Sequence, residues 1–412
     1  MTKISETVSK ILFQKMSGRN SNTTKRLNGV SKSVPEKVAK TAVKVKKSEI
    51  VGKENNTVKK DKLVQNQPRT QSVPLNNNKA FKKDKVKKTI KSKQKILNGS
   101  LASSRTGKIF VGYHASSAGG VHNALVHTTE IGARCLALFL RPQRTWSAPP
   151  LSPEVVEKWH SLVSSHSLSP HLILPHGSYL LNLGSPEESQ RAKSVEVLVD
   201  ELQRCQELGI LLFNIHPGSS CGKISREESI RNIADGINTA HSRTPGSRVK
   251  VVLENMSCQG HTIGGDLREL RQIIDLIEDK TRVGVCLDTC HAMAAGYDLS
   301  CQVTFMILQT ILWTRNIFEQ VGFDRLLEDF NSMVGWEWLV GCHLNDSKGP
   351  AGCHRDRHEK IGKGCIGVDG FRRIVNCPHF TDIPLILETP LDEELGNQGY
   401  LQEIELLNSL IQ

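Results

Sequence analysis

The chain has 412 residues and a formal net charge of +12, but the charge is unevenly distributed. Residues 1–107 hold 27 Lys and Arg against 6 acidic residues, whereas residues 108–412 hold 27 against 36, together with all 15 His and all 11 Cys. The longest apolar run, residues 303–313, is about half of the ~20 residues needed to cross a bilayer, so composition argues against a helical membrane protein.

The first segment, residues 1–107, is predicted to be a disordered, Lys-rich tail. It lacks Trp, Tyr, Cys and His, so it cannot bury enough apolar surface to offset the loss of chain entropy. It could be a solubilising tail, or a nucleic-acid or nuclear-import patch centred on residues 82–93. The basic first twenty residues also fit a mitochondrial presequence. We expect a nuclear location, with the mitochondrion as a second compartment.

The second segment, residues 108–412, is predicted to be one (β/α)8 TIM barrel domain. Short runs rich in Val, Ile and Leu alternate with amphipathic stretches such as 186–208 and 226–240. The runs are nearly continuous in apolar residues, which is typical of parallel strands buried on both faces. Eight such runs in about 305 residues match this barrel; they cover residues 109–113, 135–140, 172–174, 211–215, 249–253, 283–287, 339–342 and 385–387.

Apart from run 109–113, which His114 follows, six of these eight runs are followed directly, or after one residue, by a carboxylate or an imidazole. In a barrel these positions lie at the C-terminal mouth, where active sites are assembled. Carboxylates gathered there would repel one another unless cations neutralise them, and His with Asp or Glu is a ligand set preferred by zinc. The sequence therefore predicts a metal site at the mouth, from His176, His216, Glu254, Asp288, His343 and Glu388.

Two short motifs extend this set to nine. We expect strand 283–287 to turn into a loop at Asp288-Thr289-Cys290-His291, so that His291 points at the same volume as Asp288. In Asp356-Arg357-His358 the i, i+2 spacing of an extended chain places both ionisable side chains on one face. Nine ligands exceed what one or two tetrahedral ions need, whereas three ions with bridging carboxylates would account for them. His114 and His261 are the candidates for supporting contacts.

These strings resemble the endonuclease IV family, the zinc-dependent apurinic/apyrimidinic (AP) endonucleases, over essentially all of residues 108–412 and none of the tail. The resemblance rests on LPHGSY (174–179), NIHPGS (214–219), LEN (253–255), CLDTCH (286–291), HLNDSK (343–348), DRH (356–358) and LILET (385–389).

The resemblance implies three Zn2+ per chain, and the ligand types would also allow Mn2+ at one site. The first zinc would be held by His176, His216 and Glu254, the second by Glu254, Asp288, His343 and Glu388, and the third by His291, Asp356 and His358. Glu254 would bridge two ions and orient or deprotonate the attacking water.

The resemblance also implies a monomeric base excision repair enzyme that acts on double-stranded DNA containing abasic sites. It would hydrolyse the phosphodiester 5′ to the abasic site, leaving a 3′-hydroxyl and a 5′-deoxyribose phosphate, and would also clean blocked 3′ ends. Arg144, Tyr179 and Leu180 match the loops that enter the DNA in this family, although from the residues alone an exposed Tyr-Leu pair is more often loop packing.

One segment departs from the family. Residues 300–322 are longer and more apolar than expected, which predicts either an inserted stretch packed over the barrel exterior or an exposed apolar patch. Two other functions stay open at this stage. One is a metal-dependent sugar isomerase on the same barrel, and the other is a catalytically silent protein that binds abasic DNA.

Overall fold

The computed structural model describes residues 108–300 and 321–412. The predicted disordered tail, 1–107, and nearly all of the apolar segment at 300–322 lie outside the described residues, so both stay predictions.

Seven parallel strands form one curved sheet in the order β2-β1-β11-β8-β7-β5-β3. Each coincides with one of the apolar runs of the sequence. Their bounds are β1 (Phe110–His114), β2 (Leu136–Ala137), β3 (Leu212–Ile215), β5 (Lys250–Glu254), β7 (Val283–Asp288), β8 (Leu339–His343) and β11 (Pro384–Leu387).

The eighth predicted strand closes the sheet without forming a regular strand. Ile173 makes an isolated parallel bridge to Leu136 of β2, and His176 makes one to Asn214 of β3. The segment is short because a 3-10 helix, η2 (Pro170–Leu172), ends just before it, and Pro175 has no amide to donate. Its bonds to both edge strands complete the circle, which confirms the predicted (β/α)8 barrel.

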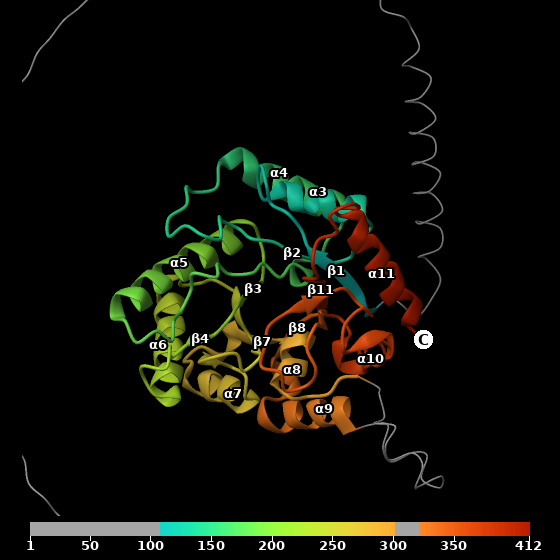
Figure 1. The fold of residues 1–412 in the computed structure, drawn as a ribbon. Coiled ribbons are helices and arrows are strands. Elements are labelled where there is room, and N and C mark those ends of the chain that lie inside the picture. The colour runs from blue at the N-terminus through green and yellow to red at the C-terminus, as the bar shows by residue number, and fades with distance from the viewer. Residues whose placement is uncertain (1–107, 301–320) are drawn as a thin grey trace, which may run out of the picture. The chain divides into compact units, whose positions relative to one another are not determined.

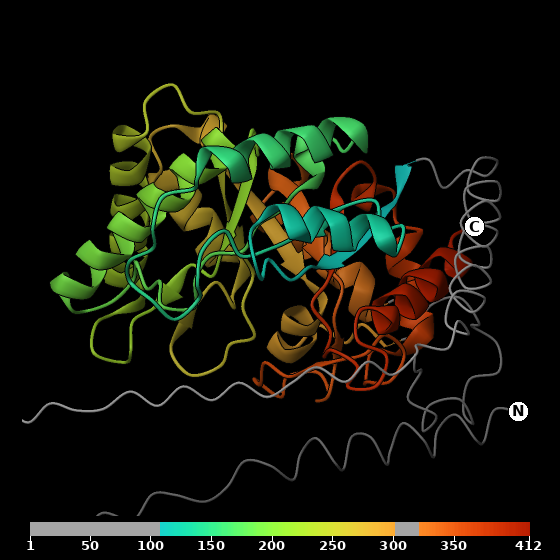
Figure 2. The ribbon, with the colours of Figure 1, turned by 90° about the horizontal axis from the view of Figure 1, so that it is seen from above.

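Helices surround the strands on the outside of the barrel in both views (Figure 1 and Figure 2). None of the helices in the described ranges is both long and apolar enough to cross a bilayer. The main helices are α3 (His122–Glu130), α4 (Pro153–Ser165), α5 (Glu188–Glu207), α6 (Arg226–Arg243), α7 (Leu267–Leu276), α9 (Val321–Met333), α10 (Gly367–Val375) and α11 (Gln398–Leu410).

Short elements complete the chain between these helices and strands. Two small antiparallel pairs lie outside the main sheet, β4 (Gly218–Ser219) with β6 (Thr262–Ile263) and β9 (Asp346–Ser347) with β10 (His358–Glu359). Besides η2, the described residues form the 3-10 helices η3 (Lys280–Arg282), η4 (Trp336–Trp338) and η5 (Pro378–Phe380), and the short helix α8 (Thr289–Ala295) directly follows β7.

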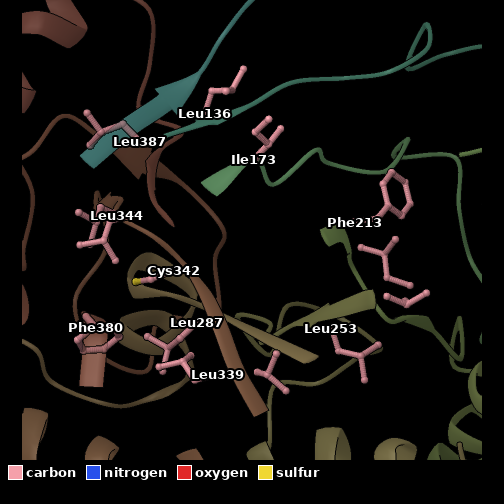
Figure 3. Packing of buried hydrophobic residues seen from close by; sticks show 14 of the residues in the cluster. Leu136, Ile173, Phe213, Leu253, Leu287, Leu339, Cys342, Leu344, Phe380 and Leu387 are labelled. Carbon is pink, nitrogen blue, oxygen red and sulfur yellow. The ribbon is translucent and has the colours of Figure 1, made fainter. Parts of the chain in front are cut away.

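The strands separate two apolar layers. Alternate strand residues point outward and pack beneath the helices, as the labelled side chains of Phe213, Leu253 and Leu287 show in Figure 3. The intervening residues fill a smaller inner cluster of Cys135, Ala137, Leu172, Leu174, Leu212, Val252, Cys286 and Ile386. This period of two decides which residues can reach the barrel axis.

A glutamate is buried in the helical layer without a partner. Glu201 of α5 is 0 % exposed, and neither carboxylate oxygen makes a hydrogen bond. Burial, only partly opposed by Arg141, raises the pKa of Glu201 to about 8. The folded protein therefore holds this side chain as the neutral acid, because an unpaired carboxylate would be costly to bury.

We expect Glu201→Gln to remove a pH-dependent loss of stability. Between an ordinary pKa near 4.5 and the folded value near 8, the unfolded chain has released its proton and the folded chain has not, so stability falls as pH rises. The free energy of unfolding should be measured in urea at pH 5 and pH 8. Relative to the native protein, that of the variant should be higher at pH 8 than at pH 5. Glu207→Gln, an exposed change on the same helix, is the control. An equal pH slope for native protein and Glu201→Gln would contradict the prediction.

Candidate metal centre

The inward-facing positions at the carboxyl ends of the strands carry the predicted ligands. Three of these ligands stand two positions after an apolar residue of the inner cluster, and so point to the same side of their strand. They are His176 after Leu174, Glu254 after Val252, and Asp288 after Cys286. His343 and Glu388 occupy the same inward phase on β8 and directly after β11, and His216 does so directly after β3. The period of two therefore points all six side chains at one mouth of the barrel.

The turn after β7 differs from its prediction. The loop expected at residues 288–291 is instead the start of helix α8, and Asp288 caps this helix by accepting a hydrogen bond from the amide of His291 at 2.7 Å. The side-chain oxygen of an N-cap residue bonds an amide two or three residues on, which holds Asp288 and His291 close together. His291 lies near the other groups, as predicted, but on a helical turn.

All nine predicted side chains come together in three groups. In each group the possible ligand atoms lie within 4.8 Å of one another, and the first two groups share the carboxylate of Glu254. They are His176, His216 and Glu254; then Glu254, Asp288, His343 and Glu388; and then His291, Asp356 and His358. The geometry therefore provides the sites that the sequence predicted, while their occupation by zinc stays a prediction.

Backbone carbonyls set the orientation of three of the imidazoles. Nδ1 of His176 donates to the carbonyl of Gly177 at 2.8 Å, Nδ1 of His291 to that of Asn255 at 2.8 Å, and Nδ1 of His358 to that of Glu388 at 3.1 Å. A neutral ring that donates through Nδ1 presents a lone pair at Nε2. This arrangement is typical of histidines that bind a metal.

Buried nitrogen atoms in the cluster lack hydrogen bonds, which tests whether the residues fit a cation. Nε2 of His291, His343 and His358 is buried without a hydrogen-bond partner. Nε2 of His291 and of His358 each lies 3.2 Å from a carboxylate oxygen of Asp356. A buried imidazole lone pair that faces a carboxylate oxygen is unfavourable unless a cation lies between them, so this donor set fits a divalent ion.

The charges in the cluster depend strongly on one another. Burial favours the neutral acid at Glu254, but the neighbouring His343 holds its pKa well below the usual range. Burial lowers the pKa of His358, but the hydrogen bond to Asp356 and the charge of Asp288 outweigh burial and raise this pKa to about 9. Burial likewise lowers the pKa of His216 to about 4, which leaves that imidazole neutral. The carboxylates therefore differ: positive partners outweigh burial at Glu254, whereas at Asp288 burial outweighs His291 and His358 and raises the pKa.

Sequence reasoning missed three buried asparagines, which hold the carboxylates or the backbone of the residues that carry them. Nδ2 of Asn214 donates to Glu254 at 2.5 Å, and Nδ2 of Asn345 donates to Asp288 at 2.6 Å. Asn345 also accepts from the amide of Glu388 at 2.9 Å, and Asn255 accepts from the amide of Asp288 at 2.6 Å. Each asparagine stands within two residues of a predicted ligand, which was the available signal.

The two predicted supporting histidines have different surroundings. Nδ1 of His114, at the end of β1, donates to Glu388 at 3.1 Å, which orients this carboxylate as expected. His261 is exposed, and its ring lies against Gly222. Within residues 108–300 and 321–412, no side-chain hydrogen bond or ion pair of His261 reaches the cluster, because the β4–β6 pair carries it away from the strand ends.

The predicted DNA-contacting residues lie around the same mouth. The side chain of Tyr179 is 62 % exposed, and its ring centre lies 5.5 Å from that of His176 and 5.9 Å from that of His216. Leu180 follows on the same loop and is half-buried. Arg144 is exposed and lines a cavity of about 1050 Å³ that also reaches His114.

Comparisons with known proteins agree with this fold and identify the family. Residues 126–410 match the family described as "Xylose isomerase-like TIM barrel". The chain is 44 % identical over 300 residues to "Probable endonuclease 4" of Chlorobium phaeovibrioides, covering 73 % of this chain and 99 % of that protein. It is 42 % identical to "Apurinic-apyrimidinic endonuclease 1" of Plasmodium berghei, covering 73 % of this chain and 55 % of that protein.

A solved structure supports the same relationship. The crystal structure of endonuclease IV from Thermus thermophilus superposes with a TM-score of 0.60 at 30 % identity, covering 73 % of this chain and 98 % of that one. A D-tagatose 3-epimerase-like protein also superposes, with a TM-score of 0.52, but at 17 % identity this likeness concerns the fold alone. The chain thus has a xylose isomerase-like TIM barrel and belongs to the endonuclease IV family.

Proposed function

We propose that this protein is a DNA repair endonuclease that hydrolyses the phosphodiester 5′ to an abasic site. The products would be a 3′-hydroxyl and a 5′-deoxyribose phosphate, and the same centre would remove blocking groups from 3′ ends. The observation that carries the proposal is the convergence of nine imidazole and carboxylate groups at one mouth of the barrel. The names of the Chlorobium and Plasmodium relatives support the same activity.

We assign three zinc ions to the three groups, with manganese able to replace zinc in one of them. The nine residues that would hold the ions are those predicted from the sequence: His176, His216, Glu254, Asp288, His291, His343, Asp356, His358 and Glu388. When bound, the ions would lower the pKa of a water and offset negative charge on the phosphoryl oxygens. His and carboxylate ligands suit zinc, whereas manganese prefers sites rich in oxygen.

Glu254 is the group of this chain that would handle the proton. Its Oε2 accepts from Asn214, while Oε1 lies 3.1 Å from Nδ1 of His343 and 3.3 Å from Nδ1 of His291. These contacts fix the plane of the carboxylate, and its ionised state leaves it able to accept a proton from an attacking water. It would orient that water beside the scissile phosphate.

Tyr179, Leu180 and Arg144 are the residues that we propose for damage recognition. An abasic site lacks stacking on one strand, so bending the duplex and extruding the sugar costs less there than in intact DNA. The exposed ring of Tyr179 stands beside the imidazoles of the first group, so a duplex held against it would have its backbone near the metal centre. Recognition and chemistry would then take place at one mouth.

Neither of the two other functions has a specific observation in its favour. A sugar isomerase would have no use for an exposed Tyr179 at the mouth, and the epimerase-like structure shares only the fold. A silent DNA-binding protein would not need nine ordered ligand groups. A nuclear location, a second location in the mitochondrion and a monomeric state stay proposals that rest on the sequence.

The activity can be tested on a duplex that carries one abasic analogue. We expect the purified chain to cut on the 5′ side, to lose activity with a strong chelator, and to regain it when Zn2+ is returned, because the ligand groups cannot replace the charge of the ions. Elemental analysis should find about three metal ions per chain, as the three groups require. Binding without cutting would indicate the silent protein, and ketose–aldose interconversion without cutting would indicate an isomerase.

Replacing the proposed proton acceptor should nearly abolish cutting. Glu254→Gln keeps the shape of the side chain but removes its negative charge, and we expect turnover to fall at least ~100-fold, as for loss of a general base. Metal content must be measured in parallel, because Glu254 is also a proposed ligand. Glu201→Gln, the buried glutamate of α5, is the matched control. Near-native turnover of Glu254→Gln would remove this residue from the mechanism.

Truncating the exposed aromatic ring should weaken damage recognition. For Tyr179→Ala we expect a loss of about tenfold in affinity for abasic over intact duplex, in line with ~1–3 kcal/mol for one stacking contact. Tyr179→Phe keeps the ring and should behave like the native protein. Folding is not at risk, because the side chain is exposed. Equal discrimination by all three proteins in a titration of both duplexes would rule out a contact with the DNA.

A further inference from the structure

A fourth group of ligand atoms overlaps the nine predicted residues and includes a thiol. Asp288, Cys290 and His358 each offer one atom, and these atoms lie within 4.8 Å of one another. Cys290 was not among the predicted ligands. It is the one cysteine that joins such a group within the described parts of the chain.

Cys290 is held in this position by the local fold. It is the second residue of helix α8, it is 0 % exposed, and its Sγ–H donates weakly to the carbonyl of Arg357 at 3.6 Å. Arg357 directly precedes His358, so the thiol lies beside the strand that carries this imidazole. Nε2 of His358 lies 3.8 Å from Oδ2 of Asp288 and makes no hydrogen bond.

The group of Asp288, Cys290 and His358 shares its Asp and its His with the proposed zinc sites. His358 also belongs to the group with His291 and Asp356, and Asp288 also belongs to the group with Glu254, His343 and Glu388. An ion bound through Cys290 would therefore compete for one ligand of each of these two sites. The two arrangements differ in softness, since one offers nitrogen and oxygen and the other adds a sulfur.

We propose that Cys290, Asp288 and His358 form an alternative site for a soft divalent cation such as Cd2+. On binding, the thiol releases its proton to solvent and Sγ donates an electron pair to the ion, with no change in oxidation state. Thiolate ligands favour soft cations over zinc bound by nitrogen and oxygen, and more strongly over manganese. Occupation of this site withdraws Asp288 and His358 from the zinc arrangement, which makes it an inhibitory site.

This inference rests on the proposed metal centre, but its test does not depend on DNA cleavage. Cd2+ is added in steps to the full chain with its metals in place, and sulfur-to-cadmium charge-transfer absorption is followed in the ultraviolet. We expect the absorption to saturate at one Cd2+ per chain, with release of zinc into solution. Cadmium NMR of the same sample should give a resonance shifted towards sulfur-ligated values, which tests the native protein directly.

Three variants identify the sulfur. Cys290→Ala should lose the absorption and the shifted resonance. Cys205→Ala removes an equally buried thiol of α5 that belongs to no ligand group, and Cys353→Ser removes a half-buried thiol of the neighbouring loop; both should keep the two signals. Circular dichroism and thermal unfolding check that each variant is folded.

The outcomes separate this inference from the proposed function. Native protein saturated with Cd2+ but without sulfur signals would overturn the alternative site, as would signals that persist in Cys290→Ala. Neither result would bear on cutting of abasic DNA by the zinc-loaded protein. Conversely, a protein that shows the sulfur signals but never cuts abasic DNA would retain the cation site and lose the nuclease assignment.

Discussion

Side chains alternate along each strand of a closed parallel barrel, and the rest of this structure depends on that constraint. Because the carboxyl ends of all the strands lie at one mouth, every inward position in the last layer shares the same small volume. His176, Glu254, Asp288, His343 and Glu388 occupy such positions. A shift of one residue in any strand would turn its ligand outward into the helical layer, so packing of the outer apolar residues also sets the register of the site.

Burying so many ionisable groups is tolerable only because each has a compensating neighbour. An isolated buried charge would cost several kcal/mol, and a pair repays this only when its remaining atoms are hydrogen-bonded. The asparagines supply those bonds. Asn345 is the most connected of them, since it donates to Asp288 and accepts from the amide of Glu388. It therefore links the carboxyl ends of β7 and β11, between which β8 lies in the sheet.

The mouth also combines hydrophobic and charged chemistry at short range. Tyr179 leaves a large aromatic ring exposed next to His176, at the place where we propose that it contacts the DNA. Cys290 adds a sulfur atom directly before His291 and two residues after Asp288, which offer nitrogen and oxygen. Because the ligand groups overlap, a thiol-binding cation would compete with the catalytic ions for the same side chains.

The sequence by itself determined the barrel and the nine-residue set, because both follow from local patterns. Apolar runs with polar residues at their ends identify buried parallel strands and their carboxyl ends, and residue type identifies the donors. It also named His114 as a candidate for a supporting contact, and in the structure His114 contacts Glu388. The sequence was less informative where a boundary depended on neighbours: the strand expected at 135–140 is only Leu136–Ala137, and the loop expected at 288–291 is a helix.

Only the tertiary structure decided how atoms from distant segments meet. The proton positions of His176, His291 and His358 follow from carbonyls that reach Nδ1, and two of these carbonyls are 30 or more residues away along the chain. The bonds of Asn345 to Asp288 and the proximity of Cys290 to His358 likewise span more than 55 residues. Sequence spacing carries no information about such contacts, because they depend on how whole loops fold over the mouth.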